Sequence, residues 1–150
     1  DDFDLESVLA TTWHITPQGY LRSQELGMML HRYILMPEAH QHVDHINMNK
    51  SDNTRVNLRI ATRSQNLHNR PKQHRKVGFK GVYWYPKRGM WRAKIMLQRR
   101  YLHLGYFGTA EEAATAYDAF ARQNIGSFAR YNFPQLGEMS ALIFPQPEIA

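Results

Sequence analysis

The sequence contains no cysteine among its 150 residues. Disulfide bridges, thiolate zinc sites, iron–sulfur clusters and cysteine nucleophiles are therefore excluded. It also lacks an apolar run of about 18 residues and a charged-then-apolar leader, so we expect neither a membrane span nor a secretory signal. The composition, with 43% hydrophobic and 21% charged residues, is that of a folded chain long enough for one ordinary domain or two small ones.

Acidic residues are almost missing from the middle of the chain. Residues 46–108 carry fifteen Lys or Arg and one acid, Asp52, a net charge of +14, whereas residues 1–45 carry −5 and residues 109–150 carry −3. A basic stretch that also contains aromatic and apolar residues is typical of a folded surface for a polyphosphate partner. A membrane surface is less favoured, because basic membrane anchors are helical and these residues lie in segments patterned as strands and turns.

Apolar runs separated by turn signals predict short elements in the first half of the chain. We expect short strands over Thr12–Ile15, Tyr20–Leu21 and Met28–Met36. From residue 40 to 70 the pattern predicts a strand, a polar loop, a second strand and a short helix. Thr62 and Gln65 form a capping box at the start of that helix, and Pro71 ends it.

Three strand-like runs with tight turns follow a basic, aperiodic linker over residues 71–78. The runs are Phe79–Tyr85, Met90–Leu97 and Tyr101–Phe107, which predict an antiparallel meander. A second capping box, from Thr109 to Glu112, begins a helix that runs to about Asn124 and carries a stripe of alanines. The predicted fold class is therefore α+β, with a three-stranded antiparallel sheet packed on one α-helix.

The polar residues between 44 and 66 can supply the chemistry of phosphodiester cleavage, which needs a base, a cation and a rigid frame. His45 is a suitable base because its unperturbed pKa lies near neutral pH. Asp44 and Asn66 offer hard oxygen donors for Mg²⁺ or Mn²⁺, and the Asn57 amide can tie down the loop. Neighbouring strand residues point to opposite faces, so Asp44 and His45 converge on one phosphate only near a strand end or bend.

This segment resembles the signature of the HNH nucleases, which have the ββα-metal or His-Me finger fold. The resemblance rests on Val43-Asp44-His45-Ile46-Asn47, Asp52-Asn53, Asn57-Leu58-Arg59 and Gln65-Asn66, and Leu30-His31-Arg32 resembles the segment that commonly precedes them. It implies His45 as general base, Asp44 and Asn66 as metal ligands and Asn57 as the residue that orients the loop.

Other interpretations of the same residues stay open. The segment is also compatible with a polar hairpin with incidental His and Asn, or with a zinc site built from His40, His42 and His45. Arg32 either contacts phosphate or caps a neighbouring carbonyl. His14, His68 and His74 have no partner pattern, and we expect them to be surface or packing residues.

Strand alternation predicts two different faces for the second sheet. Along Trp91–Leu97, one face carries apolar side chains and the other carries Arg92, Lys94 and Met96. If Val82 faces the core, then Tyr83 and Tyr85 join this second face, which is cationic and aromatic. Such a sheet can enter the major groove of DNA.

Residues 78–134 resemble the Apetala-two, or ethylene-response-factor type, DNA-binding domain. The resemblance rests on Lys80-Gly81-Val82, Trp91, Leu104-Gly105-Tyr106-Phe107, Thr109-Ala110-Glu111-Glu112-Ala113-Ala114, Ala116-Tyr117-Asp118 and Asn132-Phe133-Pro134. It implies a DNA-contacting sheet. We add Arg92 of the same sheet and two arginines of the first half of the chain. The candidate DNA-binding residues are therefore Lys80, Tyr83, Tyr85, Arg92, Lys94, Met96, Tyr101, His103, Arg32 and Arg59.

Together the two resemblances imply a metal-dependent DNA endonuclease of the phage or homing type. The expected organisation is an HNH domain over 1–70, a linker over 71–78, an Apetala-two domain over 79–134 and a tail of unknown role over 135–150. We expect one divalent ion, Mg²⁺ or Mn²⁺, no small-molecule cofactor, duplex DNA as partner, no membrane, and a monomer or weak dimer that nicks one strand. The cytoplasm of a bacterial or phage-infected cell is the expected location. A non-catalytic DNA-binding regulator or architectural protein, and RNA binding or cleavage, are the alternatives.

Overall fold

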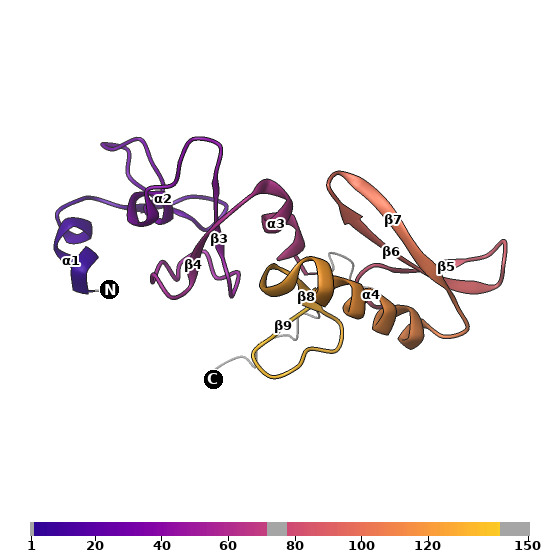
Figure 1. The fold of residues 1–150 in the computed structure, drawn as a ribbon. Helices are drawn as coiled ribbons and strands as arrows, with labels where there is room; N and C mark the ends of the chain where they lie inside the picture. The colour runs from indigo at the N-terminus through magenta and orange to yellow at the C-terminus, as the bar shows by residue number, and fades with distance from the viewer. Residues whose placement is uncertain (1, 72–77, 142–150) are drawn as a thin grey trace, which may run out of the picture. The chain divides into compact units, whose positions relative to one another are not determined.

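The computed structural model describes residues 2–71 and 78–141. The chain forms two compact units, Asp1–Asn66 and Leu67–Ala150, and Figure 1 shows their elements. Most of the expected linker and residues 142–150 of the expected tail lie outside the described residues. Each unit has its own apolar core.

The first unit contains three helices and two small antiparallel hairpins among its described residues. In chain order they are α1 (Asp2–Leu9), β1 (His14–Ile15), β2 (Leu21–Arg22), α2 (Leu30–Leu35), β3 (His42–His45), β4 (Leu58–Ala61) and α3 (Arg63–His68), which extends into the second unit. Its apolar core joins α2 to the second hairpin through Leu30, Ile34, Val43 and Leu58. The β3–loop–β4–α3 order is the predicted strand, loop, strand, helix unit.

The expected strand over Met28–Met36 is wrong, because Leu30–Leu35 is the helix α2. Leu30, His31 and Ile34 are its buried residues, and this i, i+1, i+4 spacing is that of one helix face. The helix ends at Met36, which has the left-handed φ of 47° that commonly closes a helix. A mainly apolar run of this length, here interrupted by His31 and Arg32, does not distinguish a buried helix from a strand. The sequence also does not predict helix α1, which spans Asp2–Leu9.

The second unit is a three-stranded antiparallel sheet packed on one long helix, as the sequence predicts. Its sheet consists of β5 (Val82–Tyr85), β6 (Met90–Leu97) and β7 (Arg100–Phe107), and its helix is α4 (Ala110–Asn124). Both capping boxes form: Thr109 and Glu112 exchange hydrogen bonds at the start of α4, and Thr62 and Gln65 do so before α3. The α+β fold class is therefore confirmed.

Alanines let α4 approach the sheet closely. Ala93, Ala113 and Ala114 have no exposed surface, and they pack with Val82 in one apolar cluster. Gly81 precedes β5 with φ +77°, and a Cβ there would overlap the ring of Tyr117. A larger residue at Gly81 would therefore separate helix and sheet.

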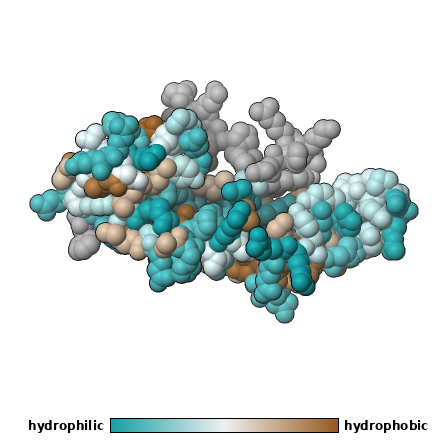
Figure 2. All heavy atoms as spheres, turned by 90° about the horizontal axis from the view of Figure 1, so that it is seen from above, coloured by the Kyte–Doolittle hydropathy of each residue, from teal (hydrophilic) through white to brown (hydrophobic). Residues whose placement is uncertain are grey.

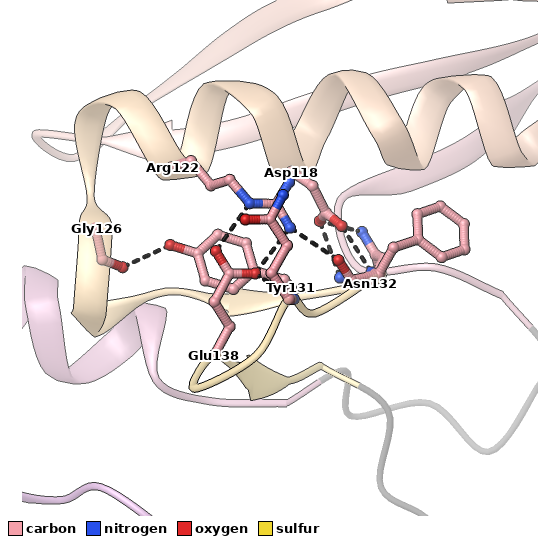
Figure 3. A network of polar contacts seen from close by, with 8 residues as sticks. Asp118, Arg122, Gly126, Tyr131, Asn132 and Glu138 are labelled. Atoms are coloured by element: carbon pink, nitrogen blue, oxygen red, sulfur yellow. Dashed lines mark hydrogen bonds and ion pairs between the residues drawn. The ribbon is translucent and has the colours of Figure 1, made fainter.

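The segment after α4 is fastened to the helix by a buried polar network (Figure 3). Asp118 is 1% exposed and accepts hydrogen bonds from the backbone N–H of Asn132 at 2.9 Å and of Phe133 at 2.7 Å. Arg122 forms a two-bond ion pair with Glu138. Short strands β8 (Arg130–Tyr131) and β9 (Met139–Ser140) pair in parallel beside this network. Part of the expected tail therefore belongs to the second unit.

Candidate functional site

The site in the first unit lies where strand β3 ends. Asp44 and His45 are its last two residues and are 4% and 6% exposed. Beyond His45 the backbone turns, with Met48 N–H donating to His45 O at 3.0 Å and Met48 adopting a φ of 67°. Asp44 and His45 therefore lie at the end of the strand, which is where two neighbouring side chains can turn toward the same phosphate.

The tautomer of His45 follows from its contact with Asn53. His45 Nε2 lies 3.2 Å from Asn53 Oδ1. The amide nitrogen of Asn53 donates to the carbonyls of Lys50 at 3.3 Å and Ser51 at 3.2 Å, so its oxygen faces the imidazole. A carbonyl oxygen only accepts, so Nε2 carries the hydrogen and, in the neutral ring, the lone pair is on Nδ1. Sequence reasoning gave Asn53 no role beyond membership of the motif.

Asn57 holds the loop that connects β3 and β4. Its Oδ1 accepts from the backbone N–H of Asn47 at 2.9 Å, and its Nδ2 donates to Asp52 O at 2.7 Å. Asp52 accepts hydrogen bonds from Thr54 and Asn47, which lower the pKa of its carboxyl group. Hydrogen bonds from the loop's own side chains therefore hold its backbone in place. This positions Asn53 next to His45.

Arg59 is paired within the first unit, and its predicted DNA contact stays a prediction. Its Nε and Nη2 both lie 2.8 Å from Asp44 Oδ2, and the two side chains are only 15% and 5% exposed. The pairing register explains the contact, because Arg59 of β4 lies directly opposite Asp44 of β3. Arg59 is therefore the buried counter-ion of Asp44.

Arg32 also contacts the backbone within the first unit. Its Nη1 donates to Gln41 O at 3.0 Å, which is the carbonyl-capping alternative. Asn66, the second expected metal ligand, is half-buried in α3. Its amide oxygen and the Asp44 carboxylate belong to the class of hard donors that Mg²⁺ and Mn²⁺ prefer.

The zinc alternative is wrong. Within residues 2–71 and 78–141, no three His, Asp or Glu side chains cluster closely enough to hold a metal ion. His40 lies in the turn before β3 and pairs with Glu38 at 3.4 Å, whereas His42 begins the strand and is exposed. His40 therefore lies outside the strand that carries His42 and His45.

Two aromatic side chains from other segments surround His45. His31 of α2 meets it edge-on, with ring centroids 5.2 Å apart and an interplanar angle of 75°. The Tyr20 ring, just before β2, lies 5.4 Å from His31 and 6.1 Å from His45. Burial, reinforced by the nearby charges of His45 and Arg32, lowers the pKa of His31 to about 4, so this ring is uncharged at neutral pH. The sequence does not predict that Tyr20 contacts His31 and His45, because these contacts depend on how the first hairpin folds.

The exposed face of the second sheet combines cations with aromatic rings, as strand alternation predicts. Lys94 Nζ lies 4.5 Å from the ring centroid of Tyr83 and 4.6 Å from that of Tyr101. The Arg92 guanidinium lies 5.2 Å from the Tyr85 centroid. Each such contact holds a long cationic side chain against a ring, which reduces the entropy it loses on binding a ligand. Cross-strand pairing places Met96 beside Tyr101 and Lys94 beside His103.

A bulge in β6–β7 adds Tyr106 to this face, which simple alternation does not predict. The register shifts between Ala93 and Lys94, so Arg92 pairs with Tyr106. The Tyr106 ring lies 4.5 Å from His103, and the Arg88 guanidinium lies 4.5 Å from the Tyr106 centroid. Sequence reasoning missed both residues. The bulge carries no sequence mark other than Gly105, which has φ +144°.

Lys80 makes its contacts within the second unit rather than on this face, and its predicted DNA contact stays a prediction. Its ammonium donates to His68 O at 2.6 Å, and burial lowers the pKa of Lys80 to about 8. Its backbone N–H donates to Asn132 Oδ1 at 2.6 Å. Lys80 is therefore a partly buried cation held by contacts to His68 and Asn132.

On the molecular face drawn in Figure 2, hydrophilic residues predominate and hydrophobic ones gather in small patches. Among the described residues, no helix has the length and apolar character to cross a bilayer.

Comparisons with known proteins match both units. Residues 36–68 match a family model described as HNH endonuclease, and residues 77–127 match one described as AP2 domain. An Acanthamoeba polyphaga mimivirus protein, named as an uncharacterized HNH endonuclease, is 33% identical over 127 residues. That alignment covers 80% of this chain and 66% of the relative, so the chain spans slightly less than two thirds of the relative's length. Residues 36–68 of the first unit thus match the HNH class. The chain as a whole carries an HNH endonuclease domain followed by an AP2 domain.

Proposed function

We propose that this protein is a metal-dependent DNA endonuclease, in which the HNH domain hydrolyses a phosphodiester bond and the AP2 domain binds duplex DNA. The observation that carries the proposal is the arrangement at the end of β3. There His45 is held through Nε2 by Asn53, so that the lone pair of its neutral ring is on Nδ1. A fixed imidazole whose basic nitrogen is defined is what a general base requires.

In the proposed reaction, His45 Nδ1 takes a proton from a water molecule while the water oxygen attacks the phosphorus. The bond from phosphorus to the 3′-oxygen breaks, which leaves a 5′-phosphate and a 3′-hydroxyl end. The His45 proton then returns to solvent or to the leaving oxygen. Asn57 supports this step indirectly, because it fixes the loop that carries Asn53.

Asp44 and Asn66 are the residues that would hold a divalent ion. The donor set fits Mg²⁺ or Mn²⁺, which are commonly bound by one or two protein oxygens with waters completing the shell. Asp44 Oδ2 lies 2.8 Å from Arg59 Nε and Nη2, so the carboxylate stays ionised and keeps the hard oxygen character that such an ion prefers. A divalent ion bound there would supply positive charge that stabilises the leaving 3′-oxygen.

A single His45 site per chain favours nicking over double-strand cleavage. Supercoiled plasmid incubated with the protein and Mg²⁺ or Mn²⁺ is expected to become open circles, and EDTA is expected to abolish this product. Gel electrophoresis measures the conversion, and end-labelling identifies the 5′-phosphate. If the protein retards DNA in a gel but leaves it intact with either metal, the non-catalytic regulator is the better interpretation.

The exposed sheet face is the proposed DNA surface of the AP2 domain. Its members are Tyr83, Tyr85, Arg88, Arg92, Lys94, Met96, Tyr101, His103 and Tyr106. Cations can meet phosphates or guanine edges, and rings can contact sugars and thymine methyl groups. Competition between duplex DNA and duplex RNA of the same sequence would distinguish DNA from RNA as the partner.

Replacing Lys94 with Met is expected to weaken DNA binding and to lower the slope of log K against log salt by about 0.9, the value for one lost phosphate contact. The side chain is held between Tyr83 and Tyr101 on the exposed face, where its charge meets solvent or ligand. Fluorescence anisotropy over a salt series measures both changes.

Lys80→Met is the matched control, since it removes the same charge from a cation whose ammonium is bound to His68. It is expected to lower thermal stability and to leave the salt slope unchanged. A salt slope that falls with Lys80→Met and not with Lys94→Met would refute this assignment of the surface.

A further inference from the structure

Three side chains from separate segments converge on one imidazole. His45 ends β3, His31 comes from α2, and Tyr20 precedes β2. The three ring centroids lie 5.2, 5.4 and 6.1 Å apart, so each ring contacts both others. Edge-on and tilted ring pairs at such distances are attractive, by about 0.5–1.5 kcal/mol beyond area burial.

The Asn53 hydrogen bond alone does not define the plane of the His45 ring. It fixes the position of Nε2, but the ring can still tilt about that contact while the hydrogen bond is kept. Tilting displaces Nδ1, which lies across the ring. The edge of the His31 ring opposes such tilting, because the interior at this point is closely packed and His31 is only 9% exposed.

We propose that His31, backed by Tyr20, is a positioning residue that fixes the plane of the His45 imidazole so that Nδ1 faces the attacking water. This inference rests on the proposed function of His45 as general base. It gives the first hairpin and α2 a role in the reaction, since they supply the two rings that hold the base.

The chemistry of His31 suits a positioning role. Its ring stays uncharged at neutral pH because of its burial, so it does not repel the imidazolium that forms on His45 during the reaction. Its Nδ1 is buried and has no hydrogen-bond partner among the described residues. The contact to His45 is therefore made by the ring itself, which a phenyl ring can replace.

The Tyr20 ring is braced from its outer side. Lys50 Nζ lies 4.6 Å from the Tyr20 centroid and donates to Gln18 O at 2.8 Å. The Tyr20 backbone is tied to Thr16 by two hydrogen bonds, at 2.7 and 3.1 Å, across the hairpin turn. Because the Tyr20 ring is held in this way and packs against His31, it limits how far the His31 ring can move when the His45 ring tilts.

The test compares ring-removing with ring-keeping variants in the full chain. His31→Ala and Tyr20→Ala are expected to lower kcat for plasmid nicking by about 10- to 100-fold, because a displacement of about 1 Å at a reacting group has effects of this order. DNA affinity and KM are expected to stay within about threefold, since neither ring belongs to the proposed DNA surface. His31→Phe and Tyr20→Phe keep the rings and are expected to restore most of kcat.

Tyr33→Ala is the matched control for general damage to this unit. Tyr33 lies in α2 and contacts Trp13 at 5.6 Å, on a different side of the helix from His45. It is expected to lower the melting temperature while kcat per folded molecule is unchanged. The imidazole resonances of His45 in a two-dimensional NMR spectrum should shift in His31→Ala and Tyr20→Ala and remain in place in Tyr33→Ala.

The outcomes separate this inference from the function on which it rests. If His31→Phe is as slow as His31→Ala while both are folded, a ring nitrogen is needed and the positioning role is wrong. If His31→Ala is as fast as the parent, the role is also wrong, although His45 remains the base. If His45→Ala itself cleaves at the parental rate, then the proposed function of the site fails.

Discussion

His45→Ala is expected to lower the rate of plasmid nicking by about 10²- to 10⁴-fold, the usual contribution of a general base. The variant keeps the proposed metal ligands and the proposed DNA surface but removes the imidazole that we propose accepts the proton of the attacking water. DNA affinity should change little, because His45 is buried at the end of β3. Single-turnover cleavage of a labelled duplex, at protein concentrations above Kd, measures the chemical step alone.

His42→Ala serves as the control for this experiment. His42 begins the same strand, but its side chain is exposed. Its removal is expected to leave both stability and rate close to those of the parent. Equal rates for His45→Ala and the parent would show that another group is the base.

Arg59→Met is expected to lower the free energy of unfolding of the first unit by about 3–5 kcal/mol, because it removes a positive charge that is paired with a buried carboxylate. The carboxylate is that of Asp44, whose side chain is 5% exposed. Methionine keeps much of the length and apolar volume of the arginine stem, so the effect reports the lost charge rather than a cavity. Chemical denaturation followed by circular dichroism measures the change.

The double variant Asp44→Leu with Arg59→Met isolates the ion pair. It removes both charges together, and replacing a buried pair by apolar residues is often neutral or stabilising. We therefore expect its stability to recover most of the single-variant loss, while cleavage is lost with the Asp44 ligand. A stable Arg59→Met protein with weakened DNA binding would instead support the phosphate contact that the sequence suggested.

The second unit could be predicted almost completely because its signals are local. Two-residue alternation gives the faces of β6, and the capping box at Thr109 gives the start of α4. The prediction failed at Tyr106, where the bulge between Ala93 and Lys94 shifts the register. A bulge is a property of the strand pair, so one strand read by itself does not reveal it.

The first unit was less predictable because its contacts join distant segments. The Asp44–Arg59 pair depends on strand register across the long loop from Ile46 to Asn57, which neither strand specifies alone. The rings of His31 and Tyr20 reach His45 only once α2 and the first hairpin are folded against β3. The HNH signature could therefore be recognised from its residues. The side chains that pack against Asp44 and His45 could not be predicted from the sequence.

The Asp44–Arg59 pair has a consequence for metal supply. A site whose carboxylate has an internal counter-ion avoids an uncompensated negative charge in the absence of a divalent cation. The first unit should therefore fold in the presence of chelator, with its core of Leu30, Ile34, Val43 and Leu58 intact. Under the proposed metal-dependent function, chelation would then be a reversible off state rather than a route to unfolding. Protein purified without metal and loaded onto DNA would be expected to start cleavage when the ion is added.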